Sequence, residues 1–447
     1  MFALLTPVRD ILAIAKKQLK TEFSFKKWLT WRYLLLLLVF SLTCITACSN
    51  EEVPLTGNQL QGNLLIWHSL EPEAAKLIND SFQEFEQLNP NVKIQSIHLP
   101  KEQIISKFIG QSQKGFGASA LIELNRNLPA LIESKRLRAI APAEMDLNRY
   151  FPANIQQIRY QDKLYGIPLK SSTQVLCYNQ AKLQNSDNSS LSQPPKTLDE
   201  LIERAKKGYS IGMVSNFEDT FWGIGNFGGY LVNDQGQIEI SLAAWSKWLT
   251  WLKQAVTQRN FVILRTDHKI LDKAFLKGFL TYYVCNSSEI ATFKKILKEN
   301  LKVALLPGNK PFKATPFLYT ETLMINRSTS DNESALAIAL GKFLTNPEHQ
   351  LQGIVQTESL IPTNRQVLMD QAFLPIESVL LEQAKTAVAI RLDNLAKILP
   401  SFDVAESLYQ SAIAGEISTE QAAQELTELI NRQLGLTMKP TSSSPTH

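Results

Sequence analysis

Residues 64–94 read LLIWHSLEPEAAKLINDSFQEFEQLNPNVKI, and the fold class can be inferred from this stretch. It opens on four consecutive apolar residues, the length and character of a short buried strand. Residues 73–88 then predict a helix with Phe82 and Phe85 on its apolar face, and the following Asn-Pro ends it. Residues 92–99 alternate in polarity and predict a second strand. This order predicts an α/β unit with a mainly parallel sheet.

The alternation of helices and strands continues along the chain. Further strands are predicted at 118–124 and 175–178, and helices at 104–110, 128–134, 198–207 and 335–344. Ser418 is predicted to cap a final helix that ends at Leu434. Thr197, with Glu200 three residues on, indicates a capping box. Trp245 and Trp248 lie on a predicted helix that faces a core. Because 447 residues exceed the usual size of one domain, we expect two lobes or two domains.

The formal charge of +4 is unevenly distributed. Residues 1–47 hold seven Lys or Arg and two Asp or Glu, whereas the rest of the chain holds 39 basic and 40 acidic residues. The basic excess therefore belongs to the leader, and it gives no argument for a nucleic-acid partner.

The leader predicts export and a lipid anchor. A basic stretch precedes the apolar run 33–43, and Ala47-Cys48 follows, as in a bacterial lipobox. We expect residues 1–47 to be a signal peptide, Cys48 to be lipidated and residues 48–63 to form a tether. An uncleaved anchor helix over residues 28–47 is the alternative, and Arg32 within it counts against it. The prediction is a protein at the periplasmic or extracellular face of the cell envelope.

The two remaining cysteines, Cys177 and Cys285, show no C-x-x-C spacing. They are either small buried hydrophobic residues or a disulfide in an oxidising compartment. No hydrolase, metalloprotease or P-loop motif is present, and the five histidines form no ligand-spaced pair. We therefore expect no catalytic centre, no cofactor and no metal.

The order of the sequence segments carries a family resemblance. Besides residues 64–94, the chain contains YQDKLYGIPLKSSTQVLCYN, TLDELIERAKK, GGYLVNDQGQIEI, AFLKGFLTYYVCNSS, VALLPG, LMINRSTSDNESALAIALGKFLTNPEHQ, IPTNRQVL and IAGEISTEQAAQEL. Together these resemble the family 1 extracellular solute-binding proteins, the sugar-type receptors of ABC importers. The resemblance implies a two-lobe periplasmic-binding-protein fold with hinge crossings and a ligand cleft between the lobes.

The resemblance also implies lobe limits. Lobe 1 would comprise 64–169 and 317–363, lobe 2 would comprise 170–316 and 364–436, and residues 437–447 would be a disordered tail. The chain would cross between the lobes at about Lys170–Gln174, near Pro316 and near Thr363.

By the same resemblance, ligand-binding residues would follow the strand ends. The candidates are Trp67, His68, Glu71, Glu123, Asn125, Tyr165, Phe221, Trp222, Asn286, Ser288, Tyr319, Glu321 and Phe402. The sequence departs from the family pattern at Ser119-Ala120, where Pro-Asp is usual, and near Ser288, where a Trp is common. Trp67 could instead be a core residue. The Gly-rich loop WGIGNFGG favours exposure of Trp222 to the cleft, where an aromatic face could stack on a sugar ring.

The function that follows is a monomeric solute-binding lipoprotein, not an enzyme, that delivers a sugar or polyol to ABC permease subunits. Three alternatives stay open. A degenerate receptor could act in sensing or envelope assembly. Adjacent Tyr282 and Tyr283 resemble the tyrosines of ferric-ion receptors. A polysaccharide-acting enzyme would need a carboxylate pair at hydrolase distance.

Overall fold

The structure is a computed structural model that describes residues 60–183, 193–229, 241–264, 268–357, 359–368 and 374–435. These residues belong to one compact unit, Leu60–His447. The predicted signal peptide, Cys48, nearly all of the tether and the tail 437–447 lie outside the described residues. No described helix has both the length and the apolar character needed to cross a membrane.

Six strands form the first sheet, in the order β13-β6-β12-β3-β1-β2. Their bounds are β1 Gly62–His68, β2 Val92–His98, β3 Ala120–Leu124, β6 Ile167–Ser172, β12 Tyr319–Ile325 and β13 Ile361–Pro362. β1 pairs in parallel with β2 and β3, as the strand-helix-strand pattern predicted. β12 runs antiparallel to β3 and β6. The sheet is therefore mixed rather than mainly parallel, because β12 is not joined to its neighbours by the short βαβ connections of the first strands.

Five strands form the second sheet, in the order β11-β7-β10-β8-β9. Their bounds are β7 Gln174–Asn179, β8 Ile211–Val214, β9 Phe261–Leu264, β10 Tyr282–Asn286 and β11 Leu301–Ala304. β8 is parallel to β9 and β10, and β7 is antiparallel to β10 and β11. The short strands β4 Arg159–Tyr160 and β5 Lys163–Leu164 pair as a separate hairpin.

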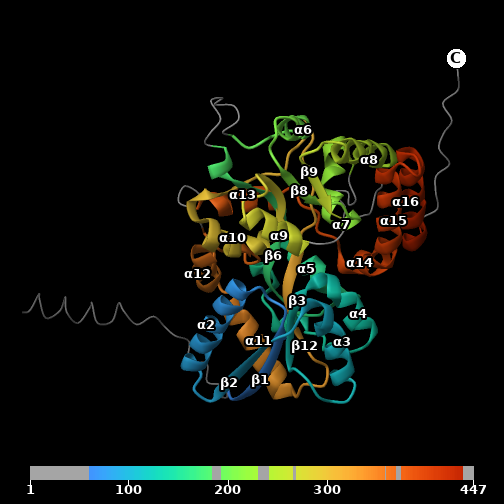
Figure 1. Ribbon diagram of the computed structural model, residues 1–447. Coiled ribbons are helices and arrows are strands. Elements are labelled where there is room, and N and C mark those ends of the chain that lie inside the picture. Colours follow the sequence, from blue (N-terminus) through green and yellow to red (C-terminus); the bar gives the residue numbers. More distant parts are fainter. Residues whose placement is uncertain are drawn as a thin grey trace, which may run out of the picture. The chain divides into compact units, whose positions relative to one another are not determined.

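Helices cover both sheets (Figure 1). Around the first sheet lie α2 Pro72–Leu88, α3 Lys101–Ser112, α4 Leu128–Glu133, α5 Pro152–Ile158, α11 Asp331–Leu344 and α12 Pro347–Thr357. The remaining helices are α6 Leu198–Lys206, α7 Phe217–Thr220, α8 Leu242–Val256, α9 His268–Leu276, α10 Ile290–Leu297, α13 Pro375–Ala384, α14 Leu392–Ile398, α15 Phe402–Ala414 and α16 Thr419–Leu434. α8, α15 and α16 pack together beside the second sheet. Each sheet with its helices is an α/β lobe.

The chain changes sheets at three places. β6 ends at Ser172 in the first sheet and β7 begins at Gln174 in the second, so Thr173 is the first crossing. The chain returns between β11 and β12, and it leaves the first sheet for the last time after β13. These three crossings are the covalent connections about which the two lobes can move.

Polar side chains cap several helices as predicted. Thr197 Oγ1 accepts a hydrogen bond from Glu200 N at 3.1 Å, and Ser418 Oγ accepts one from Gln421 N at 3.0 Å. Glu200 does not complete the predicted box, because its carboxylate accepts from Lys196 N at 2.7 Å instead of from the Thr197 amide. A full capping box is present at Ser330 of α11.

Candidate functional site

A cavity of about 490 Å³ lies where the strand ends of both sheets meet. The first sheet contributes the residues after β1 and β3 and the first residues of β12, and the second sheet contributes those after β8 and β10. Residues at the carboxyl ends of strands in an α/β sheet are where ligands usually bind. The lining is mostly polar or charged, and its aromatic members are Phe317 and Tyr319.

On the first-lobe side, Glu123 is held by neutral donors. Its carboxylate accepts hydrogen bonds from the Ser69 hydroxyl, from Leu124 N at 3.2 Å and from Asn127 Nδ2 at 3.0 Å. Burial raises the pKa of Glu123, although these donors and the charge of Lys101 oppose the rise. Glu123 lies in β3, so the sheet fixes its position beside β1.

Two ion pairs lie on the same side of the cavity. Lys170 Nζ of β6 lies 3.5 Å from Glu321 Oε2 of the neighbouring strand β12, and both side chains are largely buried. Lys101 Nζ, at the start of α3, lies 2.9 Å from Glu71 Oε1 in the loop after β1. Burial raises the pKa of Glu321, with the Lys170 charge acting in the opposite direction.

Glu218 of α7 joins the two lobes. Arg126 Nη1, which follows β3, lies 2.8 Å from Glu218 Oε2. The Tyr319 hydroxyl of β12 donates to Glu218 Oε1 at 2.5 Å. Burial raises the pKa of the Glu218 carboxyl, and the Arg126 charge opposes this rise. One carboxylate of the second lobe thus accepts from two donors of the first lobe.

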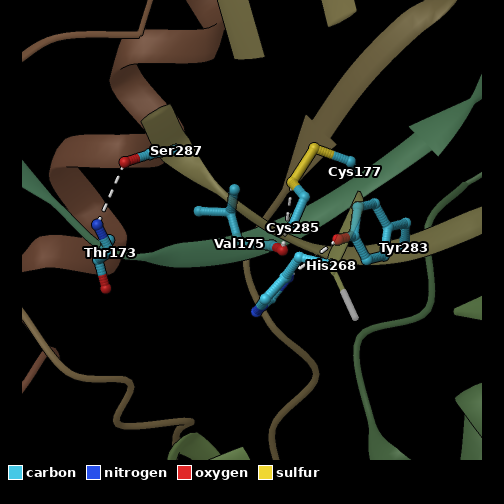
Figure 2. The surroundings of a disulfide bond; sticks show 7 residues. All are labelled: Thr173, Val175, Cys177, His268, Tyr283, Cys285 and Ser287. Carbon is cyan, nitrogen blue, oxygen red and sulfur yellow. Dashed lines mark hydrogen bonds between the residues drawn. A yellow bond between two sulfur atoms is a disulfide. The ribbon is translucent and has the colours of Figure 1, made fainter. Parts of the chain in front are cut away.

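Asp219, the next residue of α7, makes a second set of polar contacts. It lies 2.9 Å from His268 Nε2 and accepts from Gln174 Nε2 at 3.1 Å and from Asn216 Nδ2 at 2.7 Å. Burial lowers the pKa of His268, but its hydrogen bond and charge interaction with Asp219 outweigh burial, and the pKa is raised overall. The other ring nitrogen of His268 lies 3.1 Å from the Tyr283 hydroxyl (Figure 2).

A disulfide lies near His268 and Tyr283 in the second sheet (Figure 2). Cys177 of β7 and Cys285 of β10 are bonded, with their Cα atoms 5.9 Å apart. Both cysteines are fully buried on adjacent antiparallel strands. Of the two possibilities that the sequence left open, the structure shows the disulfide. Next to it, the first crossing is tied to the loop after β10, because Thr173 N donates to Ser287 Oγ at 3.1 Å.

Six of the predicted ligand-binding residues line the cavity: Glu71, Glu123, Asn286, Ser288, Tyr319 and Glu321. Each of the six lies in a strand that borders the cavity or within three residues after one. Whether they contact a ligand stays a prediction.

Trp222, Phe221 and Phe402 do not line the cavity, which corrects the prediction made for them. Trp222 is fully buried, and its ring lies 5.0 Å from that of Trp248. Phe221 is buried and stacks on Phe317 at 4.1 Å, and Phe402 lies 6.3 Å from the same ring. These rings belong to an aromatic core of the second lobe, and Phe317 is the member that reaches the cavity.

The glycines of the loop WGIGNFGG allow close packing, which is why Trp222 is buried rather than exposed as predicted. A Cβ atom at Gly223 would come within 2.2 Å of the Trp248 ring, and one at Gly225 would come within 2.4 Å of Thr315. The loop therefore carries glycine because its backbone packs directly against α8 and the return crossing. A Gly-rich loop can serve close packing as well as exposure.

The four other predicted residues do not line the cavity either. Trp67 packs against Phe108, and Lys107 Nζ lies 5.5 Å above its ring, so the core alternative holds for it. His68 faces His98, and burial together with that neighbour lowers its pKa to about 4. Asn125 is fully buried and accepts from Thr320 N at 2.9 Å. Tyr165 is half-buried and packs on the core of the first lobe.

The geometry does not support the ferric-ion alternative. Tyr282 and Tyr283 are consecutive in β10, so their side chains leave opposite faces of the sheet. Both rings are fully buried, Tyr282 near Tyr178 and Tyr283 near Phe275. Burial raises the pKa of both phenols, to about 12 for Tyr282, which disfavours the phenolate form that ligates iron. Among the described residues, no group of three or more His, Cys, Asp or Glu side chains is placed to hold a metal ion.

The structure adds cavity residues that the sequence did not single out. They include Lys101, Arg126, Lys170, Gln174, Asp219, His268 and Glu289. Several of these residues lie at strand or helix ends, a position that could have marked them as cavity residues. Charged residues at such positions are, however, ordinary on a protein surface. Chemically, carboxylates, amides and cations around a polar cavity can donate to and accept from the hydroxyl groups of a small solute.

Comparisons with known proteins agree with this geometry. The family model described as "Bacterial extracellular solute-binding protein" matches residues 80–373, more than half of the chain. The galactooligosaccharide-binding protein of Bacillus subtilis (strain 168) is 20% identical over 408 residues, covering 87% of this chain and 94% of that protein. The sn-glycerol-3-phosphate-binding periplasmic protein of Salmonella paratyphi A is 23% identical over 273 residues, covering 56% of this chain and 62% of that protein.

Solved structures share the fold. The GacH receptor of Streptomyces glaucescens superposes with a TM-score of 0.74 at 19% identity, over 84% of this chain and 99% of that one. The maltose-maltodextrin binding protein of Alicyclobacillus acidocaldarius superposes with a TM-score of 0.69 at 21% identity, over 83% of this chain and its own full length. The two-lobe periplasmic-binding-protein fold that the sequence predicted is thereby confirmed.

Proposed function

The chain belongs to the bacterial extracellular solute-binding protein family, and we propose that it binds a sugar or polyol in its cavity and delivers this solute to the permease of an ABC importer. The observation that carries the proposal is the polar cavity of about 490 Å³ between the strand ends of the two lobes. Its volume lies in the range of small-molecule sites, and its carboxylates and amides suit hydroxyl groups. Relatives named for galactooligosaccharide and for sn-glycerol 3-phosphate support a hydroxyl-rich solute.

A thermal-stability screen of the purified protein tests this function. The panel contains galactooligosaccharides, maltodextrins and sn-glycerol 3-phosphate. A solute that binds only the folded chain stabilises it by about 2.7 kcal/mol when its concentration is 100 times Kd. Glu123→Gln should weaken the stabilisation, because Glu123 lines the cavity, whereas Glu203→Gln on the exposed face of α6 should not. If no solute of this kind raises the melting temperature, the proposal is wrong and a role in sensing or envelope assembly gains support.

The same proposal holds that the protein leaves its solute chemically unchanged. The expected result is full recovery of an added oligosaccharide by mass spectrometry after prolonged incubation with the protein. Shortened or transferred products would instead identify an enzyme.

We further propose that the protein acts as a monomer tethered to the envelope through a lipid on Cys48. The support is the basic leader, the apolar run 33–43 and Ala47-Cys48. Mass spectrometry of the membrane fraction should find a lipid-bearing mature N-terminus at Cys48, and Cys48→Ser should abolish it. A mature protein that still begins at Met1 would contradict the anchor.

A further inference from the structure

The Lys, Arg and His side chains that line the cavity all have a carboxylate partner from the same lining. The four pairs and their shortest N···O distances are Lys101–Glu71 at 2.9 Å, Arg126–Glu218 at 2.8 Å, Lys170–Glu321 at 3.5 Å and His268–Asp219 at 2.9 Å. The positive charges of the cavity are therefore already matched within the protein.

Two carboxyl groups of the lining remain after this pairing, Glu123 and Glu289. The hydrogen-bond donors to Glu123 are neutral: a hydroxyl, an amide side chain and a backbone N–H. Within the described part of the chain, no Lys, Arg or His lies within ion-pair distance of Glu289. The lining thus holds six carboxyl groups against three Lys or Arg and one His.

We infer that the cavity selects an uncharged, hydroxyl-rich solute and discriminates against phosphorylated and carboxylated ones. This inference rests on the proposed function and narrows its solute class. An anion entering the cavity would face the excess carboxylates, or would have to compete with a carboxylate for Lys170 or Arg126. Breaking such a pair leaves a charge poorly solvated, which is costly in a partly buried site. Hydroxyl groups, in contrast, can donate to the carboxylates without displacing any cation.

The inference distinguishes between the relatives. A phosphate ester such as sn-glycerol 3-phosphate should bind poorly here, although a relative is named for it. A neutral oligosaccharide, as in the name of the Bacillus relative, should bind well.

Calorimetry with matched probes tests the discrimination. The probes are a neutral galactotriose, the same trisaccharide ending in galacturonic acid, and sn-glycerol 3-phosphate. We expect both anions to bind at least about 100-fold more weakly than the neutral sugar, since an unfavourable charge contact in a partly buried site costs several kilocalories per mole. Anions that bind within tenfold of the neutral sugar, or more tightly, would overturn the inference while leaving the proposed function standing. If neither the neutral sugar nor the anions bind, both fall.

Releasing one cation provides the second arm of the test. Glu321→Gln leaves Lys170 without its carboxylate, and it should raise the affinity for sn-glycerol 3-phosphate at least about tenfold relative to wild type. Glu71→Gln should likewise raise the affinity for sn-glycerol 3-phosphate, because it leaves Lys101 without its carboxylate. With two variants, a folding defect in one of them does not decide the test. The matched control is Glu203→Gln, which removes a carboxylate from an exposed pair with Lys206 on α6. No gain in either folded cavity variant would overturn the inference.

A pH series provides the third arm. Burial, with Glu71 and Asp272 nearby, raises the pKa of Glu289 to about 7, while Lys101 and His268 act in the opposite direction. Below pH 7 this carboxyl group is largely protonated, so the penalty against an anion should shrink between pH 8 and pH 6. The galacturonate probe stays ionised over this range, because ordinary carboxyl groups titrate near pH 4. Its affinity should rise severalfold as the pH falls. Glu289→Gln should reduce this rise, and the part that remains is assigned to His268, whose pKa is also raised and which gains positive charge over the same range. An unchanged ratio of neutral to anionic affinity would count against the inference.

Discussion

Trp222 is packed against Trp248 in the core of the second lobe, so its truncation should affect stability rather than binding. Removing a fully buried Trp leaves a large cavity, and Trp222→Ala should lower the free energy of unfolding by about 3–5 kcal/mol. Trp222→Phe should cost less, because it keeps part of the ring volume. Denaturant unfolding measures the loss of stability, and calorimetry on the folded Trp222→Ala variant measures its affinity for the sugar. A Trp222→Ala protein of wild-type stability with weakened sugar binding would show that the ring reaches the ligand.

His68 provides a pH-dependent contribution to stability. Its pKa is about 4 in the folded protein, against 6.5 for an ordinary histidine. Between these values the unfolded chain binds the proton more readily, so stability decreases as the pH falls from about 6.5 to about 4 and levels off below. The difference corresponds to at most about 3 kcal/mol. Urea unfolding at pH 7 and pH 4.5 should show that His68→Gln loses less stability on acidification than wild type. Identical losses would contradict the assignment.

At the scale of elements, the disulfide between β7 and β10 joins the two strands that lie next to the first crossing. It links cysteines 108 residues apart, so it restricts the unfolded chain considerably. The double variant Cys177→Ala/Cys285→Ala should lose about 2–5 kcal/mol of unfolding free energy. Reductant should lower the melting temperature of the wild type but not that of the variant. If fully reduced wild type melts like the oxidised protein, the bond contributes nothing to stability.

At the scale of the whole Leu60–His447 unit, three crossings of the chain connect two lobes that both line the cavity. We predict that solute binding draws the lobes together, and small-angle scattering should then record a smaller radius of gyration. Arg126 of the first lobe contacts Glu218 of the second, so Arg126→Gln should weaken binding about tenfold and reduce the compaction. Lys206→Gln, which removes a cation from the exposed surface of α6, serves as the control. A saturating sugar that leaves the scattering curve unchanged would contradict closure.

Local sequence patterns were sufficient for several strands and helices. The strand-helix-strand pattern of residues 64–94 reappears as β1, α2 and β2, and Thr197 and Ser418 cap the helices expected of them. These features depend on side-chain periodicity and on hydrogen bonds within one turn, which the chain encodes over a few residues. Six residues predicted from strand ends also line the cavity, and whether they bind a ligand stays a prediction.

The rest depended on residues that are far apart in the sequence. The direction of β12 in the first sheet, the Cys177–Cys285 bond and the contact of Arg126 with Glu218 each join distant segments. The same holds for Trp222, whose burial follows from the approach of α8 to Gly223. A single sequence shows which side chains are charged, apolar or small. Only the packing of the lobes shows which charge has a partner, and therefore which charges of the cavity remain for a ligand.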